Sequence, residues 1–145
     1  MGMEIKFQSS NEHYVADACV AWCFDDRFTP LMGEFLKQFS HLDVVKVAGG
    51  AKALAGGPSP ERDFVLGQIK ASVRLHATKR IILMVHIDCG AYGGSKVFNN
   101  DMAQEKTHHE KELAVAVAFL NQEISGISIL CVLADFDGLY EVPTV

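Results

Sequence analysis

The sequence predicts a single-domain α/β fold in which helices flank a mainly parallel central sheet. The 145 residues are enough for one domain with a sizeable core, and we expect that domain to span residues 1–145. Four short apolar runs are continuous rather than alternating, which is typical of strands buried on both faces. Segments with helical spacing separate these runs, and repeated strand–helix–strand order indicates a parallel sheet.

Five segments are predicted as strands. The first four are the apolar runs, and the turn pair Asp137-Gly138 predicts a last short strand after the fourth run. The predicted strands cover residues 18–23, 43–47, 80–86, 127–134 and 139–142.

Three segments are predicted as helices. The first follows Pro30 and has apolar residues at positions i, i+4 and i+8, namely Leu31, Phe35 and Phe39. The second begins at Ser59-Pro60, because serine is a favourable N-cap and proline a favourable first helical residue. The third runs from about residue 106 to residue 123 and has one apolar side.

Composition and charge exclude several classes of partner. The net charge of −5 and the scattered Lys and Arg residues argue against a nucleic acid or an anionic membrane. No apolar run reaches the ~18 residues of a membrane span, and the N-terminal residues lack the order of a signal peptide. We therefore expect a cytoplasmic protein, in which four cysteines indicate metal binding or catalysis before disulfides.

Residue types that bind metals lie at the ends of two predicted strands. Cys23 ends the first strand, and His86 ends the third, with Cys89 three residues beyond it. Because ligands bind beyond the carboxyl ends of strands in open α/β sheets, we expect these residues to share one site. Two thiolates and one imidazole with a vacant fourth position are typical of catalytic zinc. Cys19 and Cys131 lie inside apolar runs and are interpreted as small buried residues.

Asp25 and Arg27 form a candidate dyad beside Cys23. In an extended chain alternate residues point the same way, so all three side chains would face one site. Asp25 could accept a hydrogen bond from zinc-bound water or take the fourth ligand position. Arg27 could hold Asp25 as a bidentate ion pair and keep its pKa low.

Other residues near these motifs have simpler interpretations. Asp88 is interpreted as a solvated loop acid or cap, or as a hydrogen-bond partner of a neighbouring loop. Adjacent helical residues point about 100° apart, so His108 and His109 are interpreted as a helix-start cluster on the surface. Phe28 and Tyr92 either line an apolar pocket or pack in the core.

The motif Cys23-x-Asp25-x-Arg27 followed by His86-x-x-Cys89 resembles the β-class carbonic anhydrase family. The resemblance implies a Zn²⁺ ion bound by Cys23, His86 and Cys89. It also implies that Asp25 and Arg27 are the catalytic dyad. Members of the family usually form dimers or larger assemblies, so a homodimer or a higher homo-oligomer is expected.

The resemblance covers most of the chain, with departures that mark a short, divergent member. Residues 44–49 are similar to the second strand of the family and the Ala-Gly loop after it. Lys46 and Val47 replace the usual Arg-Asn of that segment, and Val85 replaces the usual glycine before the zinc histidine. Only about 17 residues precede the first strand, where the family has a helical arm. None of these departures changes a ligand or the dyad.

The implied reaction is the zinc-dependent, reversible hydration of carbon dioxide to bicarbonate by zinc-bound hydroxide, which is a lyase activity (carbonate dehydratase). Three alternatives stay open. The same zinc site could hydrolyse carbon disulfide or carbonyl sulfide, which are linear like carbon dioxide. The chain could be a zinc-binding interaction protein without turnover. It could also be a thiol-redox protein, which would require Cys23 and Cys89 to pair with each other.

Overall fold

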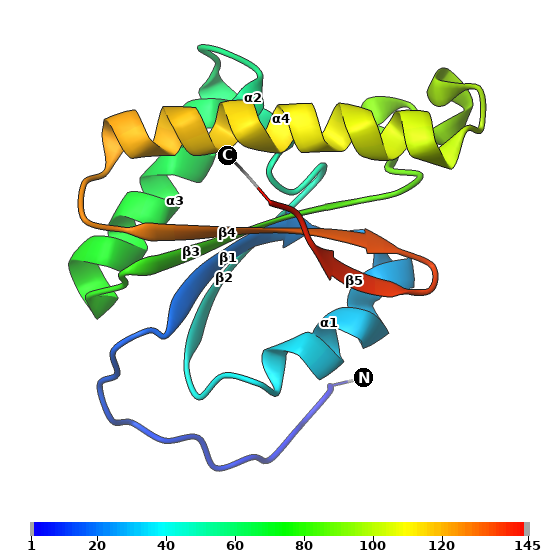
Figure 1. The fold of residues 1–145 in the computed structure, drawn as a ribbon. Coiled ribbons are helices and arrows are strands. Elements are labelled where there is room, and N and C mark those ends of the chain that lie inside the picture. Colours follow the sequence, from blue (N-terminus) through cyan, green and yellow to red (C-terminus); the bar gives the residue numbers. More distant parts are fainter. Residues whose placement is uncertain (1, 144–145) are drawn as a thin grey trace.

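The structure, a computed structural model, describes residues 2–143 (Figure 1). Five strands form one sheet in the spatial order β2-β1-β3-β4-β5. Strands β1 to β4 run parallel to their neighbours, and β5 is antiparallel to β4. The predicted fold class is therefore confirmed. The strands are β1 (Ala18–Cys23), β2 (Leu42–Val47), β3 (Arg80–His86), β4 (Ser128–Asp135) and β5 (Gly138–Glu141).

Helices cover both faces of this sheet (Figure 1). In the described part of the chain they are α1 (Thr29–Leu36), α2 (Lys52–Ala55), α3 (Pro60–His76) and α4 (Met102–Glu123). Helices α2, α3 and α4 lie on one face, and α1 lies on the other. Among residues 2–143, no helix has both the length and the hydropathy needed to cross a membrane.

Burial of both sheet faces explains why the strands are continuous apolar runs. Every residue of β1 is buried. Cys19 and Ala21 belong to the core beneath α2, α3 and α4, whereas Val20 and Trp22 belong to the core beneath α1. The alternation of side chains along a strand thus gives each face its own core.

Most predicted boundaries agree with the structure within one or two residues, but two helical predictions are wrong in extent. Helix α1 ends at Leu36, so Phe39 lies beyond it. Helix α4 begins at Met102 rather than near residue 106. The carboxylate of Asp101 accepts hydrogen bonds from two backbone amides of the first turn and caps the helix there. The earlier start adds one helical turn beneath the loop after β3.

A hydrogen-bond cluster around Asp43 ties three segments together at the end of the sheet where β2 begins. The carboxylate of Asp43 accepts hydrogen bonds from the hydroxyl of Tyr14 at 2.7 Å and the hydroxyl of Ser72 at 2.6 Å. The ring nitrogen Nδ1 of His76 lies 2.7 Å from the same carboxylate. Burial alone would raise the pKa of Asp43, but these three partners outweigh burial and lower it.

We expect Asp43→Asn to lower the free energy of unfolding at pH 7 by about 1–3 kcal/mol, because hydrogen bonds to a charged group are lost. A carboxyl group with a lowered pKa stabilises the fold above its unfolded-state pKa of about 3.9. That stabilisation is lost as the pH falls through the lower pKa of the folded state. The difference between wild type and variant should therefore shrink below pH 4, as measured by urea denaturation at pH 7 and pH 3.

Asp137→Asn is the matched control, because Asp137 is exposed and Asn-Gly is also a favourable turn pair. This variant should unfold like the wild type at both pH values. An Asp43→Asn variant whose loss of stability is the same at pH 3 as at pH 7 would contradict the assigned role of the charge.

Candidate metal centre

Three potential metal ligands meet at the carboxyl ends of β1 and β3. Cys23 is the last residue of β1, and His86 is the last residue of the neighbouring strand β3. Cys89 is brought back toward them by a turn in which Asp88 has a left-handed backbone, with φ of 57°. One ligand atom from each of the three residues lies within 4.8 Å of the others, and the two sulfur atoms are 4.0 Å apart. All three residues are buried.

The imidazole of His86 leaves one nitrogen available to a metal. Its Nδ1 lies 2.7 Å from the carbonyl oxygen of Ile87 and donates its hydrogen there. Its Nε2 is buried, and among the described residues it has no hydrogen-bond partner. The ring of Phe28 packs beside that of His86 at 4.5 Å, so Phe28 belongs to the core. Buried polar atoms usually have a partner, and an unpartnered nitrogen beside two thiols fits a bound cation.

The two thiols influence each other strongly because they are close and buried. The contact with the sulfur of Cys89, 4.0 Å away, lowers the pKa of Cys23, and His86 adds to this effect. The same proximity raises the pKa of Cys89. Burial opposes a charge on His86, but the nearby sulfur of Cys23 and the carbonyl oxygen of Ile87 raise the pKa of the imidazole overall. A divalent cation would relieve the repulsion between two thiolates, so this donor set fits a soft metal such as zinc.

Asp25 and Arg27 form the predicted bidentate ion pair, but not through an extended chain. Strand β1 ends at Cys23, and residues Asp26–Phe28 form a 3₁₀ turn that Asp25 caps. The turn brings Nη2 of Arg27 to 2.7 Å from Oδ2 of Asp25, and Nε to 3.1 Å from Oδ1. The expectation of three side chains aligned along a strand was therefore wrong, because the backbone bends after Cys23.

The ion pair keeps the carboxylate of Asp25 charged beside the three potential ligands. Hydrogen bonds from Arg27 lower the pKa of Asp25 to about 2. Asp25 and Asp88 in turn raise the pKa of the guanidinium. Oδ2 of Asp25 lies 3.9 Å from Nε2 of His86, so an ionised acceptor is adjacent to the unpartnered nitrogen.

Asp88 accepts more hydrogen bonds from neighbouring residues of the site than a solvated loop acid would. Its Oδ2 accepts a hydrogen bond from Nη1 of Arg27 at 2.9 Å, and its backbone oxygen accepts one from Nη2 at 2.9 Å. Its Oδ1 accepts a hydrogen bond from the backbone amide of Ser95 at 2.8 Å. Backbone and side-chain hydrogen bonds from Ser95 and Arg27 lower the pKa of Asp88. The alternative in which Asp88 bonds a neighbouring loop is confirmed.

A cavity of about 710 Å³ opens beside the dyad. Cys23, His86 and Cys89 do not line this cavity. Asp25 and Arg27 line it, so the cavity meets the site beside the dyad. The lining includes one further cation, Lys96, whose side chain is exposed. The lining residues are Asp25, Arg27, Asp88, Gly90, Gly93, Gly94, Lys96, Val97 and Asn100.

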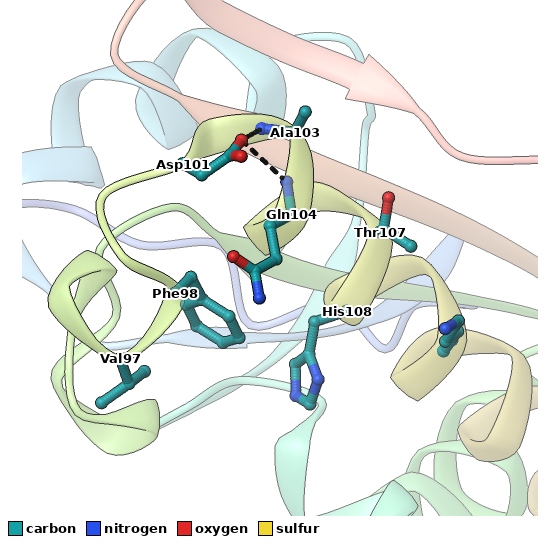
Figure 2. Close-up of a pocket in the computed structure, with 8 residues that line it drawn as sticks. Val97, Phe98, Asp101, Ala103, Gln104, Thr107 and His108 are labelled. Carbon is teal, nitrogen blue, oxygen red and sulfur yellow. Dashed lines mark hydrogen bonds between the residues drawn. The ribbon is translucent and has the colours of Figure 1, made fainter.

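The two adjacent histidines of α4 lie in different environments. His108 lines a second cavity of about 660 Å³ at the start of α4, beside Phe98, and Figure 2 shows the capping bonds of Asp101 there. His109 is fully buried and packs against Tyr92, with the two ring centroids 4.8 Å apart. Burial lowers the pKa of His109 to about 4 and raises that of Tyr92. The prediction of a surface position is therefore wrong for His109, because the helix directs its side chain into the core.

The loop after β2 approaches the metal cluster closely at Gly50. This residue has φ of 59°, and the amide of Ala51 donates to the carbonyl oxygen of Met84 in β3. A Cβ atom at Gly50 would collide with that oxygen and lie 3.0 Å from the backbone nitrogen of Cys23. Only glycine therefore fits between the ends of β1 and β3.

We expect Gly50→Ala to lower the free energy of unfolding by about 2–5 kcal/mol. The left-handed backbone contributes about 1–2 kcal/mol, and the collision contributes about 1–3 kcal/mol. Gly67→Ala is the matched control, because Gly67 is exposed inside α3 with no atom near the added methyl group. That change should raise stability by about 0.5–1 kcal/mol. Urea denaturation of both variants tests the prediction, and equal effects of the same sign would contradict it.

A known protein family matches most of the chain. Residues 15–142 match the family model described as "Putative carbonic anhydrase". No curated protein matches the sequence.

Similar folds occur among solved structures. The β-carbonic anhydrase isoform I of Trichomonas vaginalis has a TM-score of 0.65 and 14% identity, over 96% of this chain and 88% of that one. The carbonic anhydrase of Streptococcus mutans has a TM-score of 0.62 and 18% identity, over 94% and 88%. A carbon disulfide hydrolase in its apo form has a TM-score of 0.53 and 14% identity, over 92% and 81%.

Proposed function

The chain belongs to the β-class carbonic anhydrase family, and we propose that it catalyses the zinc-dependent, reversible hydration of carbon dioxide to bicarbonate. One observation carries this proposal. A buried imidazole nitrogen that has no hydrogen-bond partner among residues 2–143 lies with two buried thiols, directly beside a carboxylate that a guanidinium keeps ionised. This combination suits a metal that needs thiolate and imidazole ligands and one open position.

Cys23, His86 and Cys89 are the proposed zinc ligands. The hydrogen bond from His86 to the carbonyl of Ile87 supports this role, because it fixes the ring and leaves Nε2 free to bind. Zinc held in this way would act as a Lewis acid that makes water a nucleophile at neutral pH.

Asp25 is the proposed acceptor that orients the attacking oxygen. Its Oδ1 receives hydrogen bonds from both the amide and Nε of Arg27. Its Oδ2 accepts a hydrogen bond from Nη2 at 2.7 Å and shares the Nε hydrogen with Oδ1, at 3.2 Å. Because this second bond is shared, the oxygen nearest His86 keeps capacity for one further donor. Oδ2 can therefore accept a hydrogen bond from a reacting water or hydroxyl group, or bind the metal itself in a resting state.

Arg27 is the proposed positioning partner of Asp25. It is held by Asp25 on one side and by both the carboxylate and the backbone oxygen of Asp88 on the other. A planar guanidinium fixed by two residues cannot rotate freely, so it sets the direction of the Asp25 carboxylate.

The cavity beside the dyad suits a small neutral substrate and an anionic product. Arg27 is already paired with two carboxylates, whereas Lys96 forms no ion pair among the described residues. Lys96 would attract bicarbonate at the mouth of the cavity. A volume of about 710 Å³ exceeds the size of carbon dioxide, so other small linear molecules would also enter.

The test combines zinc content, measured by mass spectrometry on metal-replete protein, with carbon dioxide hydration, measured by stopped flow. One zinc per chain together with hydration is the expected result. One zinc without hydration would overturn the enzymatic proposal and favour a zinc-binding interaction protein. No zinc, together with a reversible disulfide between Cys23 and Cys89, would instead support a thiol-redox protein.

Hydrolysis of carbon disulfide or carbonyl sulfide is the second candidate function. The similarity of fold to a carbon disulfide hydrolase favours it. The same ligands and the same dyad would serve, and release of hydrogen sulfide from carbon disulfide would reveal this activity.

We further propose a cytoplasmic location and a homodimer or a higher homo-oligomer. Three apolar side chains near the N-terminus, Met3, Ile5 and Phe7, are at least 80% exposed in the single chain, which favours an oligomer that covers them. Light scattering coupled to size-exclusion chromatography would give the number of chains.

A further inference from the structure

A fully buried acid, Glu105, lies directly beneath the loop that joins His86 to Cys89. It belongs to the first turn of α4 and is 1% exposed. Its Oε1 accepts a hydrogen bond from the backbone amide of Asp88 at 2.7 Å, and its Oε2 accepts one from the hydroxyl of Ser95 at 2.7 Å. Both oxygens of a buried side chain thus bind the loop that surrounds the dyad.

The first of these bonds concerns the peptide unit between Ile87 and Asp88. The carbonyl oxygen of this unit accepts the hydrogen bond from Nδ1 of His86, and its amide donates to Glu105. The two bonds are shared by one rigid, planar group, so fixing the amide also fixes the carbonyl. An acceptor on the amide also polarises the carbonyl and strengthens its bond to the imidazole.

The second bond concerns the residues that hold the dyad. Ser95 donates its hydroxyl to Glu105 and its backbone amide to Asp88. Asp88 in turn holds Arg27 through both its carboxylate and its backbone oxygen. Asp88 has a left-handed backbone, which aspartate tolerates better than most residues but less well than glycine, and these hydrogen bonds help to stabilise it.

We propose that Glu105 is a positioning residue that fixes the imidazole of His86 and the guanidinium of Arg27 through the Ile87–Asp88 peptide unit. Its hydrogen bonds go to Asp88 and Ser95, and it is not among the residues that line the cavity beside the dyad. Its Oε1 also lies 3.8 Å from Nε2 of the buried His109. This inference deepens the proposed function, because it concerns the same site. It also makes predictions that do not depend on turnover.

Three variants separate the reach of the side chain from its charge. Glu105→Asp keeps the carboxylate but is one methylene shorter, so it cannot reach both donors. Glu105→Gln keeps the reach, because its amide oxygen can accept from Asp88 and its amide nitrogen can donate to the Ser95 oxygen. Glu105→Ala removes both bonds. The control is Leu113→Ala, a buried change in the same helix whose apolar side chain makes no hydrogen bond to the loop.

We expect Glu105→Asp and Glu105→Ala to raise the zinc dissociation constant about 10–100-fold, as for other residues that orient a metal ligand. Glu105→Gln should stay close to wild type. In metal-free protein, the Asp88 amide should exchange with deuterium faster in the Asp and Ala variants, as measured by NMR. Leu113→Ala should lower the melting temperature but leave zinc affinity and the relative exchange rate of Asp88 unchanged.

A Glu105→Ala variant with wild-type zinc affinity and wild-type Asp88 exchange would overturn the proposal. A loss of affinity in Leu113→Ala equal to that in Glu105→Asp would also overturn it, since general destabilisation would then explain the effect. If wild type binds zinc without hydrating carbon dioxide and Glu105→Asp still weakens zinc, the positioning role stands and the proposed function fails. If wild type binds no zinc, the Asp88 exchange rates decide the positioning role by themselves.

Discussion

Asp25→Asn is expected to lower kcat/KM for carbon dioxide hydration by about 10²–10³-fold, the loss typical of one preorganised hydrogen-bonding group. The amide of asparagine carries no charge and cannot form the bidentate ion pair that Arg27 makes with the carboxylate. If the amide nitrogen takes the place of Oδ2, the oxygen nearest His86 is replaced by a donor. Zinc content should stay near one per chain, because none of the three proposed ligands changes.

Asp26→Asn is the matched control for this prediction. Asp26 is the neighbouring residue, it is exposed, and it carries the same charge. Stopped-flow rates and zinc content should be measured on both variants and the wild type. Full activity in Asp25→Asn would remove Asp25 from the mechanism. Loss of zinc in that variant would show that Asp25 is itself needed to hold the metal.

Cys23→Ser is expected to abolish zinc binding under conditions in which the wild type is saturated, and with it all activity. A serine hydroxyl is a far poorer ligand than a thiolate for zinc, and only His86 and Cys89 would remain. The effect should exceed the about 10–100-fold loss of affinity that follows from removing a residue that only orients a ligand. The metal content after dialysis against a weak chelator provides the measurement.

Thermal unfolding gives an independent readout of the same variant. A ligand that binds only the folded state stabilises it by about 2.7 kcal/mol at 100 times its dissociation constant. Added zinc should therefore raise the melting temperature of the wild type but not that of Cys23→Ser. Cys19→Ala is the control, because Cys19 is buried in the same strand but belongs to the core beneath α3. A zinc-dependent shift in Cys23→Ser equal to that of the wild type would contradict the ligand assignment.

The strands were predictable because they are buried on both faces. The runs that form β1 and β3 are predicted with the bounds that the structure has, since each is continuous and apolar and ends at a polar residue. The start of α3 is also confirmed, with the hydroxyl of Ser59 accepting from the amide of Arg62 at 3.0 Å. These features depend on local composition and on hydrogen bonds between near neighbours in the chain.

The bidentate pair of Asp25 and Arg27 was expected from their spacing, but its geometry was not. The spacing of two residues allows either an extended chain or a tight turn. The 3₁₀ turn at Asp26–Phe28 forms because β1 ends at Cys23 and the side chain of Asp25 caps the turn. The sequence indicated the partners, whereas the fold determined how they meet.

The buried face of α4 shows most clearly what local patterns miss. Glu105 and His109 continue the stripe of Leu113, Ala116 and Leu120 toward the start of the helix. Acids and histidines usually face solvent, so the sequence predicts a later helix start and a surface histidine. The helix passes under the loop after β3, where an amide and a hydroxyl need acceptors, and this need accounts for a buried acid.

The sequence by itself determined the fold class, the order of the elements, and the residue types at the strand ends, because these depend on periodicity and on short spacings. Only the tertiary structure decided that Asp88 holds Arg27 across 61 residues and that Glu105 holds Asp88 across 17 residues. Such contacts depend on the crossing of β3, its loop and α4 in space. A hydrogen bond between distant residues leaves no periodic signal, because neither residue is constrained by its neighbours in the chain to make it.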